Sequence, residues 1–302
     1  MEPEIIHEAI LGGRVLGEGG QACIFYPALF GPSKNAHVTK LTTEADAKSE
    51  YKISQMLKAI DTKSQYGIYA SSMVECNLRR GRIYTQIVKF LRTARNPETS
   101  RCGRLAQLMI TNGAILACAV NYPKYLHDLD APLRANMTRI AAGFTNLCRG
   151  LEAMHAHNII HGDIKEANVG VTKTTFKFAD FGFAYKLSDC ESINTAFARM
   201  YRDRRYVPEQ YGGDYGIRTP LIWNVGSDCA QRRDVLLFND IFMLAFMFQN
   251  LIENNGLSWP TVFATCQQVF YAGRPGGSLQ EAKYFTASEF TTLIRAAFRR
   301  DL

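Results

Sequence analysis

Two short segments separated by a predicted β-hairpin constrain this chain more than any other feature. The first is HGDIKEAN, residues 161–168, and the second is ADFG, residues 179–182. Two β-type runs, Val169–Val171 and Phe176–Phe178, lie between them. The sequence therefore predicts a loop, a hairpin and a turn in immediate succession.

Three side chains in these segments end in hard oxygen atoms: Asp163, Asn168 and Asp180. Phosphoryl transfer needs a carboxylate that orients the attacking hydroxyl, oxygen ligands for metal ions, and cations that hold the phosphates. Asp163 and Asn168 are five residues apart on one loop, so they suit the hydroxyl and one metal ion. Asp180 follows a β-run and suits a bridging metal ion. This pattern favours a phosphotransferase.

The two segments resemble the catalytic loop and the DFG turn of the eukaryotic-type protein kinase family, serine/threonine type. The resemblance covers about residues 11–301 and implies an α+β, bilobal fold within a single kinase domain, 1–302. A small β-rich N-lobe with one main helix is expected over about 1–112, and a larger, mainly helical C-lobe over 113–302. The chain also looks similar to serine/threonine kinases of large DNA viruses.

The resemblance assigns roles in the transfer from ATP to a protein hydroxyl. Asp163 is expected to orient the hydroxyl and accept its proton, while Lys165 stabilises the transferring phosphoryl group. Asn168 and Asp180 are expected to hold two Mg²⁺ (or Mn²⁺) ions. Positioning and charge neutralisation would then supply most of the catalysis.

A glycine-rich segment, residues 17–24, lies upstream between two β-type runs and resembles the loop that covers the phosphates in this family. Glycines allow backbone N–H groups to approach phosphate oxygens. The expected nucleotide contacts are Gly17, Gly19, Gly20 and Ile24. Ala22 stands where the family has its third glycine.

Lys40 ends a β-type run, Val38-Thr39-Lys40, and resembles the lysine that grips the ATP phosphates. A helix is expected over Thr43–Ile60 with Thr43 as its N-cap, and Glu50 in this helix is the expected partner of Lys40. The adenine-binding hinge is expected in residues 108–113, with Met109 and Thr111 as the contacts.

Three further helices are expected over Met137–His155, Asp234–Ile252 and Ser288–Arg300. The second is the most apolar stretch, but Asn239 and Asp240 interrupt it, so a buried helix is favoured over a membrane span. The family ties its catalytic loop to an aspartate of such a helix. Asp240 fits this role, and Asp234 is the alternative.

The chain departs from the family where the catalytic loop reads His161-Gly162-Asp163, without the usual arginine. That arginine pairs with a phosphate on the activation segment, so its absence predicts an enzyme that needs no such phosphate. The same block also resembles small-molecule phosphotransferases such as aminoglycoside and choline kinases. Phe181-Gly182 and Lys165 favour the protein kinase. A pseudokinase scaffold is the third alternative.

The activation segment is expected to run from Asp180 to Glu209, because residues 205–209 resemble the APE element. It lacks the usual threonine but holds four arginines within residues 199–205, which suit an acidic or pre-phosphorylated protein substrate or else form a solvated loop. Three arginines near the C-terminus are candidates to pair with Glu209: Arg295, Arg299 and Arg300.

Composition adds little. The net charge of +7 suits ATP or an acidic partner, but it is also ordinary for a basic protein, and nucleic-acid binding is unlikely on this ground alone. The eight cysteines include no CxxC pair, so neither zinc-ribbon spacing nor a short disulfide framework is expected. The sequence has no signal-peptide pattern, and no membrane partner is expected. An intracellular location, in cytoplasm or nucleus, or in a host cell or virion, is the expectation.

Overall fold

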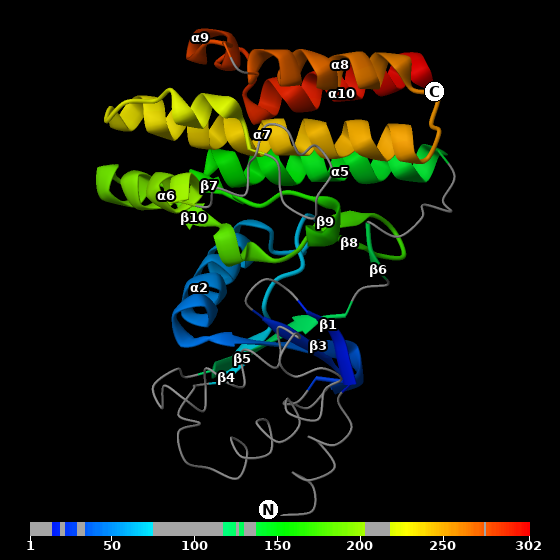
Figure 1. Cartoon of the computed structure of the whole chain (residues 1–302). Coiled ribbons are helices and arrows are strands. Elements are labelled where there is room, and N and C mark those ends of the chain that lie inside the picture. The colour runs from blue at the N-terminus through cyan, green and yellow to red at the C-terminus, as the bar shows by residue number, and fades with distance from the viewer. Residues whose placement is uncertain are drawn as a thin grey trace, which may run out of the picture. The chain divides into compact units, whose positions relative to one another are not determined.

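The structure is a computed structural model that describes residues 14–18, 22–28, 34–74, 117–124, 127–129, 137–202, 218–274 and 276–302 (Figure 1). The chain divides into two compact units. The first draws on residues 1–56 and 69–124, and the second draws on residues 57–68 and 125–302.

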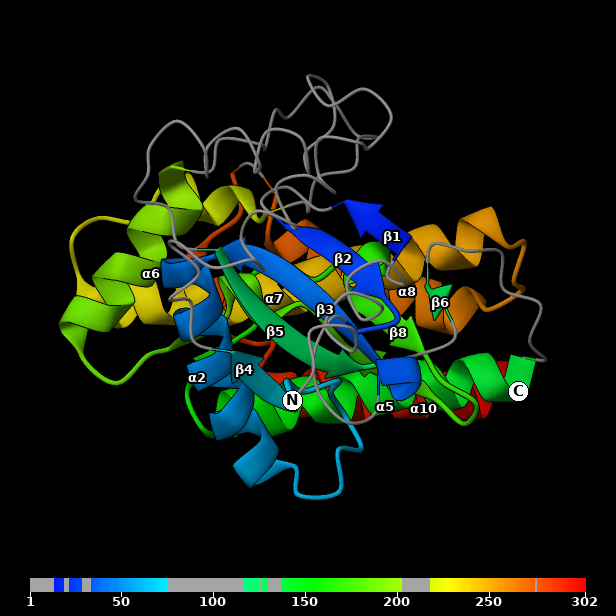
Figure 2. The same ribbon diagram turned by 90° about the horizontal axis from the view of Figure 1, so that it is seen from below.

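The first unit is built on an antiparallel sheet of five strands in the order β1-β2-β3-β5-β4 (Figure 2). The strands are β1 (Arg14–Glu18), β2 (Cys23–Tyr26), β3 (His37–Thr43), β4 (Ser72–Val74) and β5 (Ala117–Pro123), and a 3₁₀ turn η1 (Lys34–Ala36) precedes β3. β3 is central, and its five inner residues are all buried. Both faces of this strand are therefore covered, although Thr39, Lys40 and Thr42 are polar or charged.

The helix of the first unit, α2 (Glu44–Ile60), begins directly after β3. Thr43 caps it, because its Oγ1 accepts a hydrogen bond from the backbone N–H of Asp46 over 3.3 Å. Ser54 and Gln55 of α2 bind the backbone N–H and the carbonyl oxygen of Ala70, over 2.6 and 2.9 Å. The helix is thereby fixed to the segment that leads into β4, and its predicted range and N-cap are confirmed.

The second unit carries two small sheets. β6 (His127–Asp128), β8 (Val169–Val171) and β9 (Phe176–Phe178) form one, in the order β6-β8-β9. β7 (Ile159–Ile160) pairs with β10 (Tyr185–Lys186) in the other. The 3₁₀ turns η2 (Glu166–Asn168) and η3 (Phe181–Phe183) flank the β8–β9 hairpin. The predicted hairpin strands are confirmed to the residue.

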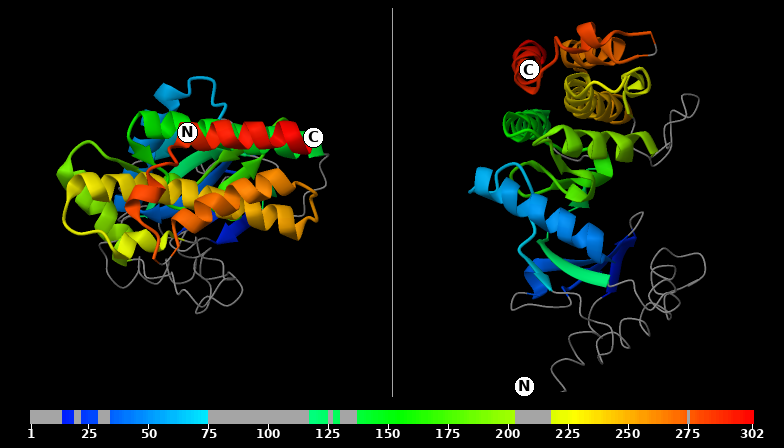
Figure 3. Two further views of the ribbon diagram at one scale, coloured as in Figure 1. Left: turned by 90° about the horizontal axis from the view of Figure 1, so that it is seen from above. Right: turned by 90° about the vertical axis from the view of Figure 1, so that its left-hand side faces the viewer.

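Helices make up most of the second unit. They are α5 (Met137–Ala156), α6 (Cys190–Arg202), α7 (Cys229–Asn254), α8 (Pro260–Ala272), α9 (Leu279–Ala282) and α10 (Ala287–Asp301), with a 3₁₀ turn η4 (Pro220–Trp223) before α7. α10 packs on α5 and α8, and α7 packs on α5 and α8 (Figure 3). The predicted helices over α5, α7 and α10 are confirmed, although α7 begins five residues earlier than expected, at Cys229, where Asp228 caps it.

Aromatic rings join these helices. Phe144 of α5 stacks on Phe248 of α7 with ring centroids 4.0 Å apart, and Trp259 and Phe298 meet it edge-on. Trp259 is 1% exposed, so it packs in the core. Such aromatic pairs add roughly 0.5–1.5 kcal/mol each beyond the area they bury.

α7 is the only helix in the described part of the chain that is long and apolar enough to cross a membrane. In this structure 78% of its most apolar 18-residue stretch is buried inside the protein, as in the core helix of a folded domain. Its two polar interior residues, Asn239 and Asp240, are fully buried and hydrogen-bonded. The predicted buried helix is confirmed.

The described residues confirm the α+β class, with a β-rich first unit that has one main helix and a mainly helical second unit. The expected lobe boundary near residue 112 lies outside the described residues. β5 belongs to the first unit. The assignment of the whole chain to one kinase domain stays a prediction.

Candidate active site

The backbone of the loop that follows β7 is held by the side chain of Asp240 of α7. Its Oδ2 accepts a hydrogen bond from the backbone N–H of His161 over 2.7 Å, and its Oδ1 accepts one from Gly162 over 2.8 Å. Because these bonds satisfy a carboxylate that is 0% exposed, they offset much of the cost of its burial. Of the two aspartates that the sequence offered for this role, Asp240 fills it. Asp234 instead pairs with Lys283 over 3.1 Å.

His155, in the last turn of α5, adds a third contact to the same carboxylate. Its Nε2 lies 3.1 Å from Oδ2 of Asp240, and its side chain is 9% exposed. Nothing in the sequence indicated this partner of His155. The contact joins α5, α7 and the catalytic loop through one buried carboxylate.

Gly162 has a backbone conformation and surroundings that leave no room for a side chain. Its φ is +78°, and a Cβ atom would lie 2.5 Å from the carbonyl oxygen of Phe183 and 2.8 Å from Cε of Met200. Arg218 approaches the same residue from another part of the chain. Its Nη1 donates to the carbonyl oxygen of Gly162 over 2.8 Å, and the residue is 3% exposed. Nothing in the sequence indicated this contact.

Asp163 is held by two neighbours on its own loop. Nζ of Lys165 lies 3.0 Å from its Oδ2, and Nδ2 of Asn168 donates to the same oxygen over 2.9 Å. Nδ2 of Asn168 also donates to the backbone carbonyl of Asp163 over 2.8 Å, which closes the loop on itself. The structure thus brings together three of the predicted site residues, and it fixes the direction of the carboxylate.

The β8–β9 hairpin brings Asn168 and Asp180 to the same end of a sheet. Val169 is paired with Phe178, and the backbone N–H of Ala179 donates to the carbonyl oxygen of Asn168 over 2.8 Å. Asn168 precedes the first strand and Asp180 follows the second. A twelve-residue separation in sequence is therefore closed by two antiparallel strands.

The donor chemistry of these two residues fits Mg²⁺. The amide nitrogen of Asn168 makes both of its hydrogen bonds to Asp163, which leaves its amide oxygen for a hard cation. Asp180 is exposed, in the left-handed region at φ 55°, while the next residue, Phe181, is 1% exposed. Among the described residues no group of three or more His, Cys, Asp or Glu side chains gathers for a metal. Mg²⁺ would accordingly take further ligands from phosphate oxygens and water.

His161 is buried against the turn that carries Asp180. Its ring centroid lies 5.2 Å from those of Phe178 and Phe181, and its Nε2–H donates to the carbonyl oxygen of Ala179 over 3.2 Å. Burial lowers the pKa of His161, although the neighbouring carboxylates of Asp240, Asp163 and Asp180 act in the opposite direction. The ring is therefore neutral near pH 7, with its proton on Nε2.

In the first unit the predicted pair of Lys40 and Glu50 is present. Nζ of Lys40 lies 2.9 Å from Oε2 of Glu50, and the two residues are 8% and 1% exposed. The hydroxyl of Tyr122, on β5, donates to Oε1 of Glu50 over 2.5 Å. Sequence reasoning missed Tyr122, because a tyrosine in a short apolar run gives no sign of its partner. Lys40 is thus directed by a carboxylate that is itself fixed.

The remaining predicted contacts are only partly described. Gly17 lies in β1 and is paired with Ile24 of β2, just after an irregularity in the register. Gly19, Gly20, Met109 and Thr111 lie outside the described residues. The APE-like residues 205–209 lie outside them as well, so the expected partners of Glu209 stay predictions.

The model of the protein kinase domain matches residues 34–210, more than half of the chain. The chain belongs to the protein kinase family. Curated relatives agree with this membership. Two Trypanosoma brucei brucei proteins named, by inference, as serine/threonine-protein kinases A and B are 32% and 44% identical over 84 residues, 28% of this chain and 20% of each relative. The cyclin-dependent kinase 4 homolog of Caenorhabditis elegans is 27% identical over 135 residues, 43% of this chain and 32% of that protein.

This kinase chain spans at most about a third of the length of these relatives. The match to the family model begins at residue 34, after the glycine-rich segment, and it includes Lys40, Glu50 and the whole of residues 161–182. The expected membership in the eukaryotic-type protein kinases is confirmed. The resemblance to kinases of large DNA viruses stays a prediction.

Proposed function

We propose that this chain is a protein serine/threonine kinase that transfers the γ-phosphoryl group of ATP to a protein hydroxyl. The observation that carries the proposal is the fixed carboxylate of Asp163, whose Oδ2 is bound by both Lys165 and Asn168. A carboxylate held in one direction is what a hydroxyl group needs to be oriented for attack.

In this mechanism Asp163 orients the substrate hydroxyl and accepts its proton. Lys165, whose Nζ lies 3.0 Å from Oδ2 of Asp163, stabilises the negative charge of the transferring phosphoryl group. Lys40, directed by Glu50, holds the phosphate oxygens of ATP. Mg²⁺ bound through Asn168 and Asp180 would neutralise charge on those oxygens.

The serine/threonine part of the proposal rests on Lys165, which in this family accompanies that specificity, and on the names of the curated relatives. The substrate is proposed to be an acidic or pre-phosphorylated protein, because residues 199–205 hold four arginines. One of them, Arg199, is engaged within the fold, with its guanidinium 4.5 Å from the ring centroid of Phe183. The other three are Arg202, Arg204 and Arg205, and they are the proposed substrate contacts.

The enzyme is proposed to act inside cells. Its activity is proposed not to need a phosphate on the activation segment. In the family, an arginine of the catalytic loop binds such a phosphate. This chain has Gly162 at that position, where a Cβ atom would overlap the carbonyl oxygen of Phe183. The catalytic loop is instead supported by the carboxylate of Asp240 and the guanidinium of Arg218. Neither contact depends on a modification.

The test is transfer of labelled phosphate from ATP, with Mg²⁺, to an acidic protein and to a basic protein, followed by identification of the phosphorylated residue. Asp163→Asn and Asp180→Asn are expected to abolish transfer. Asp234→Asn is the matched control, because Asp234 lies in the same unit and pairs only with Lys283 among the contacts described. Phosphoserine or phosphothreonine formed by the wild type, and by Asp234→Asn, supports the proposal.

Three other outcomes would contradict it. Transfer only to small molecules such as choline or an aminoglycoside would identify a small-molecule phosphotransferase. Nucleotide binding without transfer to any acceptor would identify a scaffold. Transfer that survives Asp163→Asn would place the catalytic carboxylate elsewhere.

A further inference from the structure

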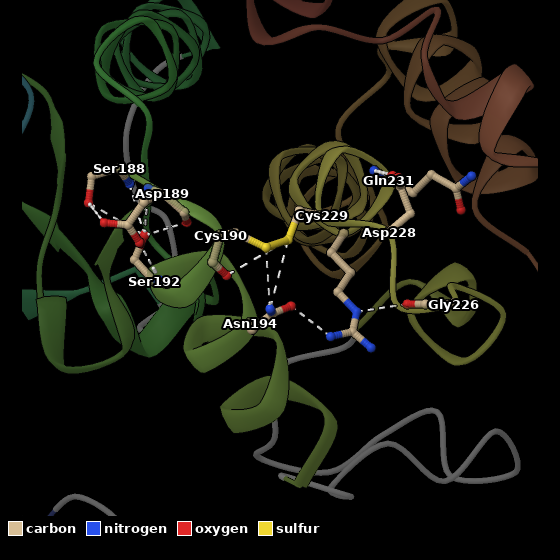
Figure 4. The surroundings of a disulfide bond; sticks show 10 residues. Ser188, Asp189, Cys190, Ser192, Asn194, Gly226, Asp228, Cys229 and Gln231 are labelled. Carbon is tan, nitrogen blue, oxygen red and sulfur yellow. Dashed lines mark hydrogen bonds between the residues drawn. A yellow bond between two sulfur atoms is a disulfide. The ribbon is translucent and has the colours of Figure 1, made fainter.

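A pair of cysteines joins the activation segment to the core of the second unit. Cys190 is the first residue of α6 and Cys229 is the first residue of α7, and the two form a disulfide although 39 residues separate them (Figure 4). Their Cα atoms are 5.6 Å apart, a distance typical of disulfides. α6 lies between Asp180 and residue 209, so it is part of the predicted activation segment.

The surroundings of this pair favour thiol chemistry. Cys190 is exposed and Cys229 is half-buried, and each sulfur lies at a helix N-terminus, where the backbone dipoles stabilise a thiolate. Nδ2 of Asn194 lies 3.5 Å from the sulfur of Cys190 and 3.8 Å from that of Cys229. Arg232 orients Asn194 by donating to its Oδ1 over 2.7 Å, so a positive charge lies beside the amide group that contacts both sulfurs.

Two carboxylates near the pair are already committed to the helix ends. Asp189 accepts a hydrogen bond from the backbone N–H of Ser192 over 2.8 Å, and Asp228 accepts one from Gln231 over 2.7 Å. Each carboxylate therefore acts as an N-cap, and its charge is partly offset by the helix that it begins.

Two other cysteines of the same unit show the opposite environment. Cys148 of α5 and Cys266 of α8 are buried, at 1% and 0% exposure, and neither is bonded. Burial raises the pKa of both thiols. They are consequently poor nucleophiles, and they provide internal controls for Cys190 and Cys229.

The far end of α6 supports the catalytic loop and the turn after Asp180. Arg199 donates to the hydroxyl of Tyr185 over 3.2 Å and lies over the ring of Phe183. Met200 is 1% exposed and lies against Gly162, where it would meet any added Cβ atom at 2.8 Å. One end of α6 is thus bonded to α7, while the other end packs on Gly162 and Phe183, which lie close in sequence to Asp163 and Asp180.

We propose that Cys190 and Cys229 are a reversible thiol–disulfide switch, and that the disulfide form holds α6 in the position that supports phosphoryl transfer. This inference rests on the proposed kinase function and adds a mode of regulation to it. The disulfide takes the place of an activation-segment phosphate, because the arginine that binds such a phosphate in the family is replaced by Gly162 in this chain. In a reducing compartment such a bond is regulatory rather than permanent.

The oxidant is a low-molecular-weight disulfide such as glutathione disulfide. The exposed Cys190 thiolate attacks one of its sulfurs, which forms a mixed disulfide and releases one glutathione thiolate. The Cys229 thiolate then attacks the Cys190 sulfur and releases the second glutathione thiolate. The two protons lost by the protein thiols pass to the two released thiolates, and the protein pair is oxidised while glutathione disulfide is reduced.

The first measurement does not involve activity. The full chain is equilibrated in glutathione buffers from fully reduced to strongly oxidised, free thiols are alkylated, and the Cys190–Cys229 linked peptide is quantified by mass spectrometry. The linked peptide is expected to form and disappear reversibly in the wild type and in Cys148→Ala. Hydrogen exchange across residues 190–202 is expected to be slower in the disulfide form. A pair that stays reduced in strongly oxidised buffer, or exchange that does not change, would overturn the proposal.

The second measurement is phosphoryl transfer in the same buffers. The wild type and Cys148→Ala are expected to lose about fivefold or more of their activity on reduction. Cys190→Ser and Cys229→Ser are expected to show the reduced level in every buffer. Equal activity in both redox states, or a redox response that survives in Cys190→Ser, would overturn the switch. If no buffer supports transfer, the kinase proposal fails, whereas the linked peptide and the hydrogen exchange still decide whether the pair is reversible and controls α6.

Discussion

Arg218 donates a hydrogen bond to the carbonyl oxygen of Gly162 over 2.8 Å, and both residues are buried. The family places an arginine within the catalytic loop at the position of Gly162. This chain has no side chain there, and the guanidinium reaches the loop backbone from a segment 56 residues away. The same guanidinium lies 5.9 Å from the ring centroid of Phe183, in the turn that follows Asp180. Arg218 therefore links the loop of Asp163 to the turn of Asp180.

Arg218→Met is expected to reduce kcat about tenfold or more, because it leaves a buried carbonyl group without its charged donor. KM for ATP should change little, since Arg218 has no proposed contact with the nucleotide. Arg218→Lys should restore part of the activity. The matched control is Arg139→Met, which removes another bond from an arginine to a backbone carbonyl, that of Thr172, in the same unit. Steady-state kinetics on folded variants would show whether the two arginines differ. Equal losses would reduce Arg218 to a general stabilising role.

Gly162→Ala is expected to destabilise the protein by about 2 kcal/mol and to lower activity. The positive φ adds strain to any side chain, and the new Cβ atom would also overlap the carbonyl oxygen of Phe183. Gly256→Ala is the control, since Gly256 has a similar φ of +61° but nothing within 4 Å of its would-be Cβ atom. Denaturant unfolding of both variants separates strain from overlap. The overlap has no consequence if Gly256→Ala is destabilised as much as Gly162→Ala and if Gly162→Ala is as active as the wild type.

The local elements of the site could be predicted from the sequence because each has its own short-range signal. Thr43 and the acidic first turn mark the start of α2, and the apolar runs around residues 169–178 mark the hairpin that brings Asn168 to Asp180. The pairing of Lys40 with Glu50 followed from the family frame and is confirmed by their 2.9 Å contact.

The contacts that were missed join residues far apart in sequence. Tyr122 reaches Glu50 across 72 residues, and Arg218 reaches Gly162 across 56. Neither residue type, nor its neighbours, indicates which distant group it will meet, since that depends on how the elements pack. The disulfide was missed for the same reason, because spacing rules detect only cysteines that are close in sequence.

Lys40→Met is expected to weaken ATP binding, by about tenfold or more, because it removes the proposed phosphate contact. It also removes one cation from the buried Glu50 carboxylate, whose Oε2 lies 2.9 Å from Nζ of Lys40. Lys48→Met is the control, since Lys48 pairs with Glu44 on the exposed face of α2, the helix that carries Glu50. Titration with a fluorescent ATP analogue gives the two affinities. Unchanged affinity in Lys40→Met would move the phosphate contact to another residue.

His161 is expected to make the stability of the protein fall as the pH is lowered below about 6.5. Burial lowers the pKa of this histidine in the folded state, so the unfolded chain binds more protons in the interval between the two pKa values. Stability therefore rises with pH through this interval and is lost as pH falls. The neutral ring of His161 also accepts a hydrogen bond on Nδ1 from the backbone N–H of Asp163, while its Nε2 donates to the carbonyl oxygen of Ala179. Protonation of Nδ1 abolishes the first of these bonds.

The measurement compares unfolding free energies of the wild type and His161→Phe at pH 7.5 and pH 5.5, where the phenyl ring keeps the packing on Phe178 and Phe181. The variant is less stable at pH 7.5, but its stability should change less on acidification than that of the wild type. Capping carboxylates do not confuse the comparison. Hydrogen bonds from Ser278 and Thr286 lower the pKa values of Glu281 and Glu289, so their contribution is lost only at lower pH and equally in both proteins. A parallel decline in the two proteins would show that His161 is protonated in the folded state with no cost.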